Sequence, residues 1–133
     1  MKKSELINLL NQDLSGEIEA ILTYMRDSFV TEECKPSRGM EDIAKDEMRH
    51  AEKLAEMIVE FGGIPAMLHR ELNFGKKGTR GYLKRLTDME KEAITMYKEH
   101  IKAISNEDIK KKLMHILREE EDHLREFSGL LKT

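Results

Sequence analysis

Two glutamates and two histidines recur at a spacing that suits metal binding. Glu47 and His50 are three residues apart, and so are Glu120 and His123. Residues three apart share one face of a helix, so each pair would aim a carboxylate and an imidazole at one point. Helices rich in Glu and His often contain such a pair by chance, so one Glu-x-x-His motif alone is weak evidence for a metal site.

The motifs belong to an internal repeat with an offset of 73 residues. The segment from Glu17 to Tyr24 reads Glu-Ile-Glu-Ala-Ile-Leu-Thr-Tyr, and the segment from Glu90 to Tyr97 reads Glu-Lys-Glu-Ala-Ile-Thr-Met-Tyr. In each half, the first glutamate lies 30 positions before the glutamate of the Glu-x-x-His motif. The repeat predicts two helical hairpins related by approximate two-fold symmetry, which a solvated surface rarely produces by chance.

Four stretches with helical periodicity would position these residues. They cover Ser4–Val30, Met40–Phe61, Gly81–Ile104 and Asn106–Leu131. Residues 35–39 (Lys-Pro-Ser-Arg-Gly) are expected to end the first helix, residues 62–65 the second, and Ser105 or Asn106 to cap the fourth. The connection from Gly62 to Arg80 can span a whole helix, so the second and third helices are expected to be parallel.

Each predicted helix carries a mainly apolar stripe with one glutamate near its middle. In a dry core, unpartnered carboxylates would each cost on the order of several kcal/mol or would have to be protonated. No Lys or Arg occupies the central stripe positions, whereas two divalent cations would balance four carboxylates. An oxygen-rich set without thiolates suits iron or manganese better than structural zinc. The predicted metal ligands are Glu17, Glu47, His50, Glu90, Glu120 and His123.

Composition limits the other classes of function. A chain of 133 residues fits one domain, 1–133, and 37% charged residues with 2 Pro, no Trp and 5% aromatics favour an all-α protein. The net charge of −3, with Lys and Arg dispersed, argues against nucleic-acid binding. No run of about eighteen apolar residues indicates a membrane span, and we expect a cytoplasmic location. The single Cys34 excludes an internal disulfide and a paired-cysteine metal site.

At these motifs the sequence resembles the bacterioferritin and rubrerythrin branch of the ferritin-like superfamily, over nearly the whole chain. The segments that carry the resemblance are 16–24, 46–51, 62–65 and 116–123. The resemblance implies a ferritin-like antiparallel four-helix bundle with a long crossover between helices two and three. It also implies two iron ions, with manganese as the alternative, bridged by Glu47 and Glu120. The terminal ligands would be Glu17 and His50 on one ion, and Glu90 and His123 on the other.

The resemblance also implies an activity. Family members oxidise ferrous iron with oxygen or peroxide, or reduce hydrogen peroxide with electrons from a partner protein. We therefore expect a di-iron oxidoreductase of ferroxidase or peroxidase type, with a separate electron donor. Tyr24 matches a tyrosine beside the family's metal site and would act catalytically or simply fill a bundle layer. Met48 matches the methionine that ligates haem at the bacterioferritin dimer interface; simple packing is its alternative.

Departures from the family keep other functions open. The sequence ends at Thr133, without the short fifth helix of bacterioferritin, and lacks the cysteine-bound iron domain of rubrerythrin. The alternatives are a non-catalytic iron storage or buffering protein of bacterioferritin type, and a helical interaction module with a structural polar seam. A homodimer or larger homo-oligomer is predicted from apolar residues that lie off the stripe and are expected to be exposed, which are Leu22, Met25, Met48 and Met57. Three histidines without repeat partners are interpreted as incidental: His69, His100 and His115.

Overall fold

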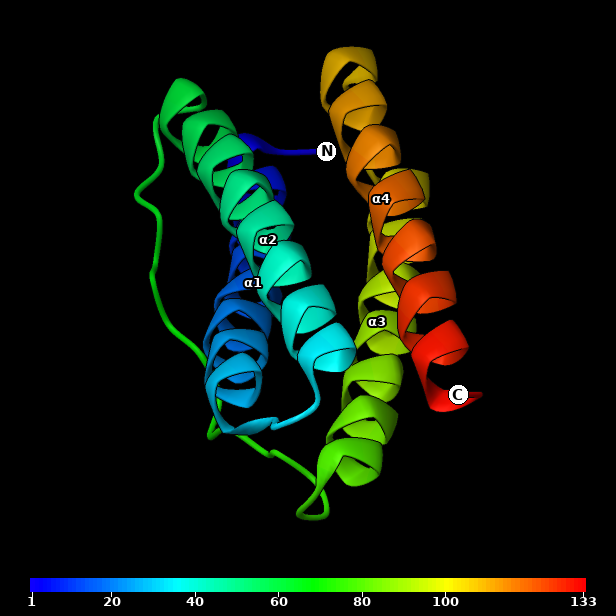
Figure 1. The fold of residues 1–133 in the computed structure, drawn as a ribbon. Coiled ribbons are helices and arrows are strands. Elements are labelled where there is room, and N and C mark those ends of the chain that lie inside the picture. The colour runs from blue at the N-terminus through cyan, green and yellow to red at the C-terminus, as the bar shows by residue number, and fades with distance from the viewer.

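The structure, a computed structural model, describes residues 1–133. Its four helices are α1 (Lys3–Val30), α2 (Cys34–Glu60), α3 (Thr79–Ala103) and α4 (Glu107–Leu131). Figure 1 shows α1 and α2 as one antiparallel hairpin and α3 and α4 as the other; α1 packs beside α3, and α2 beside α4. The predicted all-α four-helix bundle is confirmed. None of these helices combines the length and apolar character that a membrane span requires.

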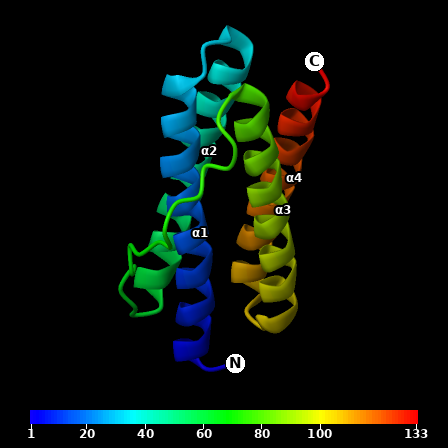
Figure 2. The ribbon, with the colours of Figure 1, turned by 90° about the horizontal axis from the view of Figure 1, so that it is seen from below.

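Residues 61–78 form the crossover from the end of α2 to the start of α3. This segment runs back along the bundle, so α2 and α3 are parallel, as predicted (Figure 2). Asn11 on α1 holds the crossover: its Nδ2 donates to the carbonyl of Ile64 at 3.3 Å, and its Oδ1 accepts from the backbone of Ala66 at 2.8 Å. Further along, Arg70 donates to the carboxylate of Glu19. The crossover is thus hydrogen-bonded to α1 at two points along the helix, Asn11 and Glu19.

The helix ends follow local backbone chemistry. Gly62, with φ of 85°, ends α2 in the left-handed region, and the backbone N–H of Gly63 donates to the carbonyl of Ile58 at 2.9 Å. A Cβ on Gly63 would lie 2.7 Å from Cγ2 of Ile7, so the absent side chain lets α1 approach closely. Asn106 caps α4 by accepting the backbone N–H of Ile109 at 3.0 Å. The predicted breaks at these two places are confirmed.

The predicted start of α2 is wrong, because the helix begins at Cys34 rather than Met40. Pro36 occupies the third helical position, where a backbone N–H has no partner within the helix and its loss costs nothing. Gly39 is buried, and a Cβ there would lie 3.1 Å from Cδ1 of Leu130. The two residues interpreted as breakers therefore begin the helix and allow close packing against α4.

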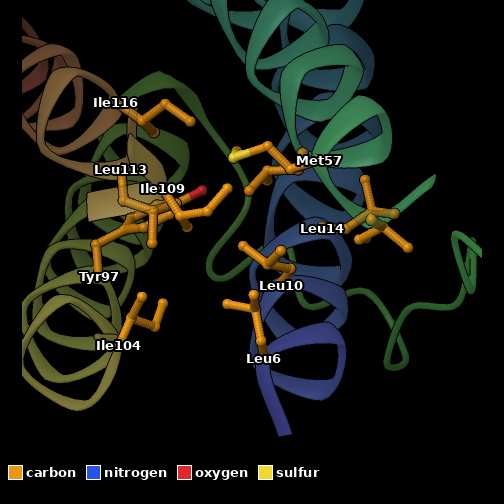
Figure 3. Packing of buried hydrophobic residues seen from close by; sticks show 11 residues of the cluster. Leu6, Leu10, Leu14, Met57, Tyr97, Ile104, Ile109, Leu113 and Ile116 are labelled. Atoms are coloured by element: carbon orange, nitrogen blue, oxygen red, sulfur yellow. The ribbon is translucent and has the colours of Figure 1, made fainter. Parts of the chain in front are cut away.

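Two apolar clusters fill the bundle on either side of its polar middle. The cluster nearer the N-terminus, which Figure 3 shows, contains Leu6, Leu10, Leu14, Leu54, Met57, Ile58, Tyr97, Ile104, Ile109, Leu113 and Ile116. The other contains Ala20, Tyr24, Met40, Ile43, Ala44, Tyr82, Leu83, Leu86, Met89 and Phe127. The predicted exposure of Met57 is wrong: it is 2% exposed, because its position three residues after Leu54 turns it to the core.

Candidate metal centre

All six residues predicted as metal ligands meet in the polar middle of the bundle, and none is more than 3% exposed. They come from all four helices: Glu17 from α1, Glu47 and His50 from α2, Glu90 from α3, and Glu120 and His123 from α4. Their donor atoms form two groups, each lying within 4.8 Å: Glu17, Glu47, His50 and Glu120, and Glu47, Glu90, Glu120 and His123. Glu47 and Glu120 belong to both groups, so the centre has two overlapping halves.

The two imidazoles turn the same nitrogen toward the carboxylates. Nδ1 of His50 lies 2.9 Å from Oε2 of Glu17 and 3.2 Å from Oε1 of Glu47. Nδ1 of His123 lies 3.1 Å from Oε1 of Glu120 and 3.3 Å from Oε1 of Glu47. The rings are stacked with centroids 5.9 Å apart. Each half of the centre therefore receives one imidazole nitrogen.

The opposite nitrogen of each ring binds an acidic residue that the sequence analysis missed. Nε2 of His50 lies 2.8 Å from Oε1 of Glu119, and Nε2 of His123 lies 2.9 Å from Oδ2 of Asp46. Each acid directly precedes the motif glutamate on the other hairpin, so the pairing is crosswise. Such outer bonds fix the orientation of a ligating ring. The sequence did contain a signal for these partners, because an acidic residue directly precedes both Glu47 and Glu120.

Burial and mutual repulsion set the charge of the carboxylates. Burial, followed by the negative charge of Glu120, raises the pKa of Glu17 to about 7 and that of Glu90 to about 8. The pKa of Glu47 is raised well above its usual value by burial and by the charge of Glu17. Burial also acts to raise the pKa of Glu120, but hydrogen bonds from both histidines lower it to about 2. Without metal, the centre therefore holds extra protons at near-neutral pH.

The two histidines hold some of these extra protons. Burial acts to lower the pKa of both imidazoles, but the bonded carboxylates outweigh it. The pKa of His123 rises to about 12, and that of His50 is also raised. In the metal-free centre, protonated imidazoles therefore stand where cations would otherwise balance the carboxylates.

The residues present fit a pair of divalent cations. Five buried carboxylate oxygens of the centre have no hydrogen-bond partner of regular geometry: Oε2 of Glu17, both oxygens of Glu47, and Oε2 of Glu90 and Glu120. Leaving a buried acceptor unsatisfied costs about 1–3 kcal/mol, so a cluster of them calls for a positive partner. The donor set is four carboxylates and two imidazoles without a thiolate, which iron and manganese accept.

Tyr24 touches the centre and Met48 does not. The hydroxyl of Tyr24 donates to Oε1 of Glu90 at 2.8 Å, and its ring packs edge-on against Phe127. Burial and the charge of Glu90 raise the pKa of Tyr24 well above 10. Met48 is 41% exposed on the outside of α2, so haem binding there stays a prediction. His100, interpreted as incidental, is 6% exposed with Nδ1 2.8 Å from Oδ1 of Asp13.

A cavity of about 440 Å³ between α1 and α3 reaches the centre. Glu17, Glu47 and Tyr24 contribute to its wall, and the crossover reaches it through Arg70. Nη2 of Arg70 lies 3.0 Å from Oε1 of Glu19, which also lines the cavity. The cavity gives small molecules a route to the carboxylates.

The chain matches the ferritin-like domain family over residues 7–133 and belongs to that family. It is a di-iron protein of the ferritin-like superfamily. It is also 39% identical over 67 residues to a bacterioferritin of Desulfovibrio desulfuricans (strain ATCC 27774 / DSM 6949 / MB). That alignment covers 48% of this chain and 37% of the bacterioferritin, so it spans little more than a third of the relative's length.

Three solved structures share the fold. A ferritin-like di-iron-carboxylate protein of Bacillus anthracis str. Ames is 28% identical, with a TM-score of 0.90 over 98% of this chain and 99% of that one. Desulfovibrio desulfuricans bacterioferritin, whose di-iron site was studied in different catalytic states, is 27% identical. Its TM-score is 0.91 over 98% of this chain and 80% of that one. A dodecameric thioferritin, the bacterioferritin-related protein of Bacteroides fragilis, is 25% identical. Its TM-score is 0.89 over 99% of this chain and 87% of that one.

Proposed function

We propose that this chain is a di-iron carboxylate oxidoreductase that reacts with oxygen or hydrogen peroxide, of ferroxidase or peroxidase type. The observation that carries the proposal is the pair of overlapping donor groups that share Glu47 and Glu120. The shared carboxylates would bridge the ions. Glu17 and His50 would complete one ion's protein ligands, and Glu90 and His123 the other's. The di-iron carboxylate protein from Bacillus anthracis supports iron over manganese.

The protein's own residues would prepare the centre for this chemistry. Two bound iron ions would supply Lewis acidity and one-electron redox chemistry, with ferrous iron as the reductant. Metal binding requires Nδ1 of His50 and His123 to release their protons, so affinity for ferrous iron should rise with pH. The hydroxyl of Tyr24 would hold the carboxylate of Glu90 in one orientation. The cavity beside Glu17 would admit the oxidant, while the two apolar clusters limit access by water.

The assembly is part of the proposal. A homo-oligomer is supported by the dodecameric relative from Bacteroides fragilis, and exposed Met48 on α2 leaves an apolar surface for a neighbouring subunit. Repeated turnover with peroxide would require a separate electron-donor protein. The bound ferrous ions would otherwise be the only source of electrons, and each turnover would oxidise them.

Elemental analysis, combined with stopped-flow oxidation of added ferrous iron, tests the proposal. We expect about two iron ions per chain, by analogy with other carboxylate bundles, and rapid loss of ferrous iron with oxygen or hydrogen peroxide. The variant carrying Glu47→Ala and Glu120→Ala should lose both metal and activity. Its matched control carries Glu52→Ala and Glu126→Ala, which remove exposed glutamates from the same two helices and should change neither.

Two results would contradict the proposal. Protein that binds no ferrous iron under anaerobic conditions would favour the helical interaction module. Iron-loaded protein that consumes neither oxidant, with many iron ions per chain in a large assembly by light scattering, would favour the non-catalytic store.

A further inference from the structure

Beside the metal centre, at the end of the bundle nearer the N-terminus, lies a buried pair of ionisable residues that the proposed centre does not use. Asp13 is 1% exposed, and its Oδ1 lies 2.8 Å from Nδ1 of His100. Neither oxygen of Asp13 nor Nδ1 of His100 has a hydrogen-bond partner of regular geometry, so the 2.8 Å contact is close but not aligned as a hydrogen bond. Burial raises the pKa of Asp13 to about 6, although His100 opposes this. A buried pair of this kind adds little to stability, because the cost of desolvation offsets the attraction.

Tyr97 lies between this pair and the metal centre. It is 1% exposed, and its hydroxyl has no hydrogen-bond partner. Figure 3 shows the hydroxyl pointing from α3 toward the α1–α2 hairpin. Burial raises the pKa of Tyr97 well above 10, and the negative charges of Glu17 and then Asp13 act in the same direction. The other groups that act on it are Glu120 from α4 and Glu47 from α2.

Helical spacing makes these residues a continuous series. Asp13 lies four residues before Glu17 on α1, and Tyr97 lies three residues before His100 on α3, so each pair shares a helix face. Because α1 and α3 are antiparallel neighbours, the series leads from Glu17 at the centre through Tyr97 and Asp13 to His100. His100 stands in the last turn of α3, and with a side chain 8% exposed it is the member of the series with the largest exposed fraction.

We infer that Tyr97, Asp13 and His100 form a proton-transfer path between solvent and the metal centre, an inference that rests on the proposed oxidase or peroxidase chemistry. Reducing hydrogen peroxide to two waters takes up two protons and two electrons. The electrons come from two ferrous ions, and the path supplies protons. As the Tyr97 hydroxyl proton moves toward Glu17, Asp13 protonates the tyrosine oxygen, His100 Nδ1 protonates Asp13, and solvent protonates His100.

The path needs local movement on both sides of the Tyr97 hydroxyl. Because the Tyr97 hydroxyl is not hydrogen-bonded to either carboxylate, a side-chain rotation or a bridging water must close each gap. Such a mobile hydroxyl can accept from one side and donate to the other. Tyr24, which is already bonded to Glu90, lacks this freedom.

The other hairpin provides the matched control. By the repeat, Leu86 stands where Asp13 would be, and Asp27 stands where His100 would be. Asp27 is fully buried, burial raises its pKa to about 6, and it pairs with Arg26 rather than with the centre. Asp27→Asn therefore removes a comparable buried carboxylate without touching the path.

The experiment measures ferrous oxidation by hydrogen peroxide in H₂O and D₂O with the full iron-loaded chain. We expect Asp13→Asn and Tyr97→Phe to slow oxidation by about tenfold or more, the scale of a lost proton-transfer group. Both should keep wild-type iron content and alter the solvent isotope effect, whereas Asp27→Asn should match wild type. Added imidazole should restore the rate of His100→Ala.

Unchanged rates and isotope effects in iron-loaded Asp13→Asn and Tyr97→Phe would overturn the path. Loss of iron from both would also overturn it, because these residues would then act by holding the centre together. A readout in the metal-free chain separates this inference from the proposed function. The infrared carboxyl band that Asp13→Asn removes should shift in Tyr97→Phe and His100→Gln but not in Asp27→Asn. A band at the same frequency in Tyr97→Phe and His100→Gln as in wild type would overturn the path, even if wild type oxidised no iron.

Discussion

The two hairpins are alike at the polar centre and different beside it. Each contributes two glutamates and one histidine to the centre, at equivalent positions of the repeat. The adjoining equivalent positions are Tyr24 and Tyr97, Leu86 and Asp13, and Asp27 and His100. Tyr24 is bonded to Glu90, whereas the hydroxyl of Tyr97 has no partner. Two similar ions need similar ligands, so the centre stays symmetric, while the surroundings can serve different roles in the two halves.

The largest expected effect is on metal content, and it should differ between glutamates that belong to both donor groups and those that belong to one. Glu47 belongs to both donor groups and Glu17 to only one. We expect Glu47→Ala to lose both ions on dialysis, because each half loses an oxygen ligand. Glu17→Ala should lose or weaken only one ion, as should Glu90→Ala in the other half. Elemental analysis after dialysis measures this, and equal losses in all three variants would contradict a shared site.

The outer acids should act crosswise between the hairpins. Asp46→Ala removes the partner of His123, and Glu119→Ala removes the partner of His50. Each should weaken one metal-binding step by about 10–100-fold, the usual effect of losing an outer bond to a ligating histidine. Anaerobic calorimetric titration with ferrous iron measures the two steps. The control is Asp122→Ala on the exposed face of α4, and variants that weaken both steps equally would refute crosswise control.

The metal-free protein should become less stable as pH rises from 5 to 8. Glu17 and Glu90, one from each hairpin, have folded pKa values raised to about 7 and about 8, so the folded state binds more protons from about pH 4.5 upward. The raised pKa values of both histidines act in the same direction above about pH 6.5. Each extra bound proton lowers stability by about 1.4 kcal/mol per pH unit.

Urea unfolding with a chelator measures this slope. Glu120 works in the opposite sense, because its lowered pKa stabilises the fold above about pH 4.5 and loses that effect toward pH 2. The variant carrying Glu17→Gln and Glu90→Gln should flatten the slope between pH 5 and 8. Stability that increased over this range would show that the carboxylates are not held protonated.

The sequence predicts those features that the repeat and helical periodicity encode. The glutamates of the apolar stripes and both Glu-x-x-His motifs are buried, as predicted. The helix face that buries Leu10 and Leu54 also buries the glutamates and histidines that lie between its apolar positions. The start of α2 was missed because a proline is harmless in a first turn. The pairing of Asp13 with His100 was missed because it joins two helices, and no periodicity within one helix reports the register between two.

The smallest expected effect compares the two tyrosines in metal-free protein. Tyr24→Phe removes a hydroxyl that donates to the Glu90 carboxylate at 2.8 Å, so it should destabilise the fold by about 1–3 kcal/mol. Tyr97→Phe removes a buried hydroxyl without a partner, so its effect should be near zero or slightly stabilising. Urea unfolding at one pH measures the difference. Equal losses would mean that Tyr97 has a hydrogen-bond partner in solution, and the contrast between the two hairpins would then be limited to Asp13 and His100.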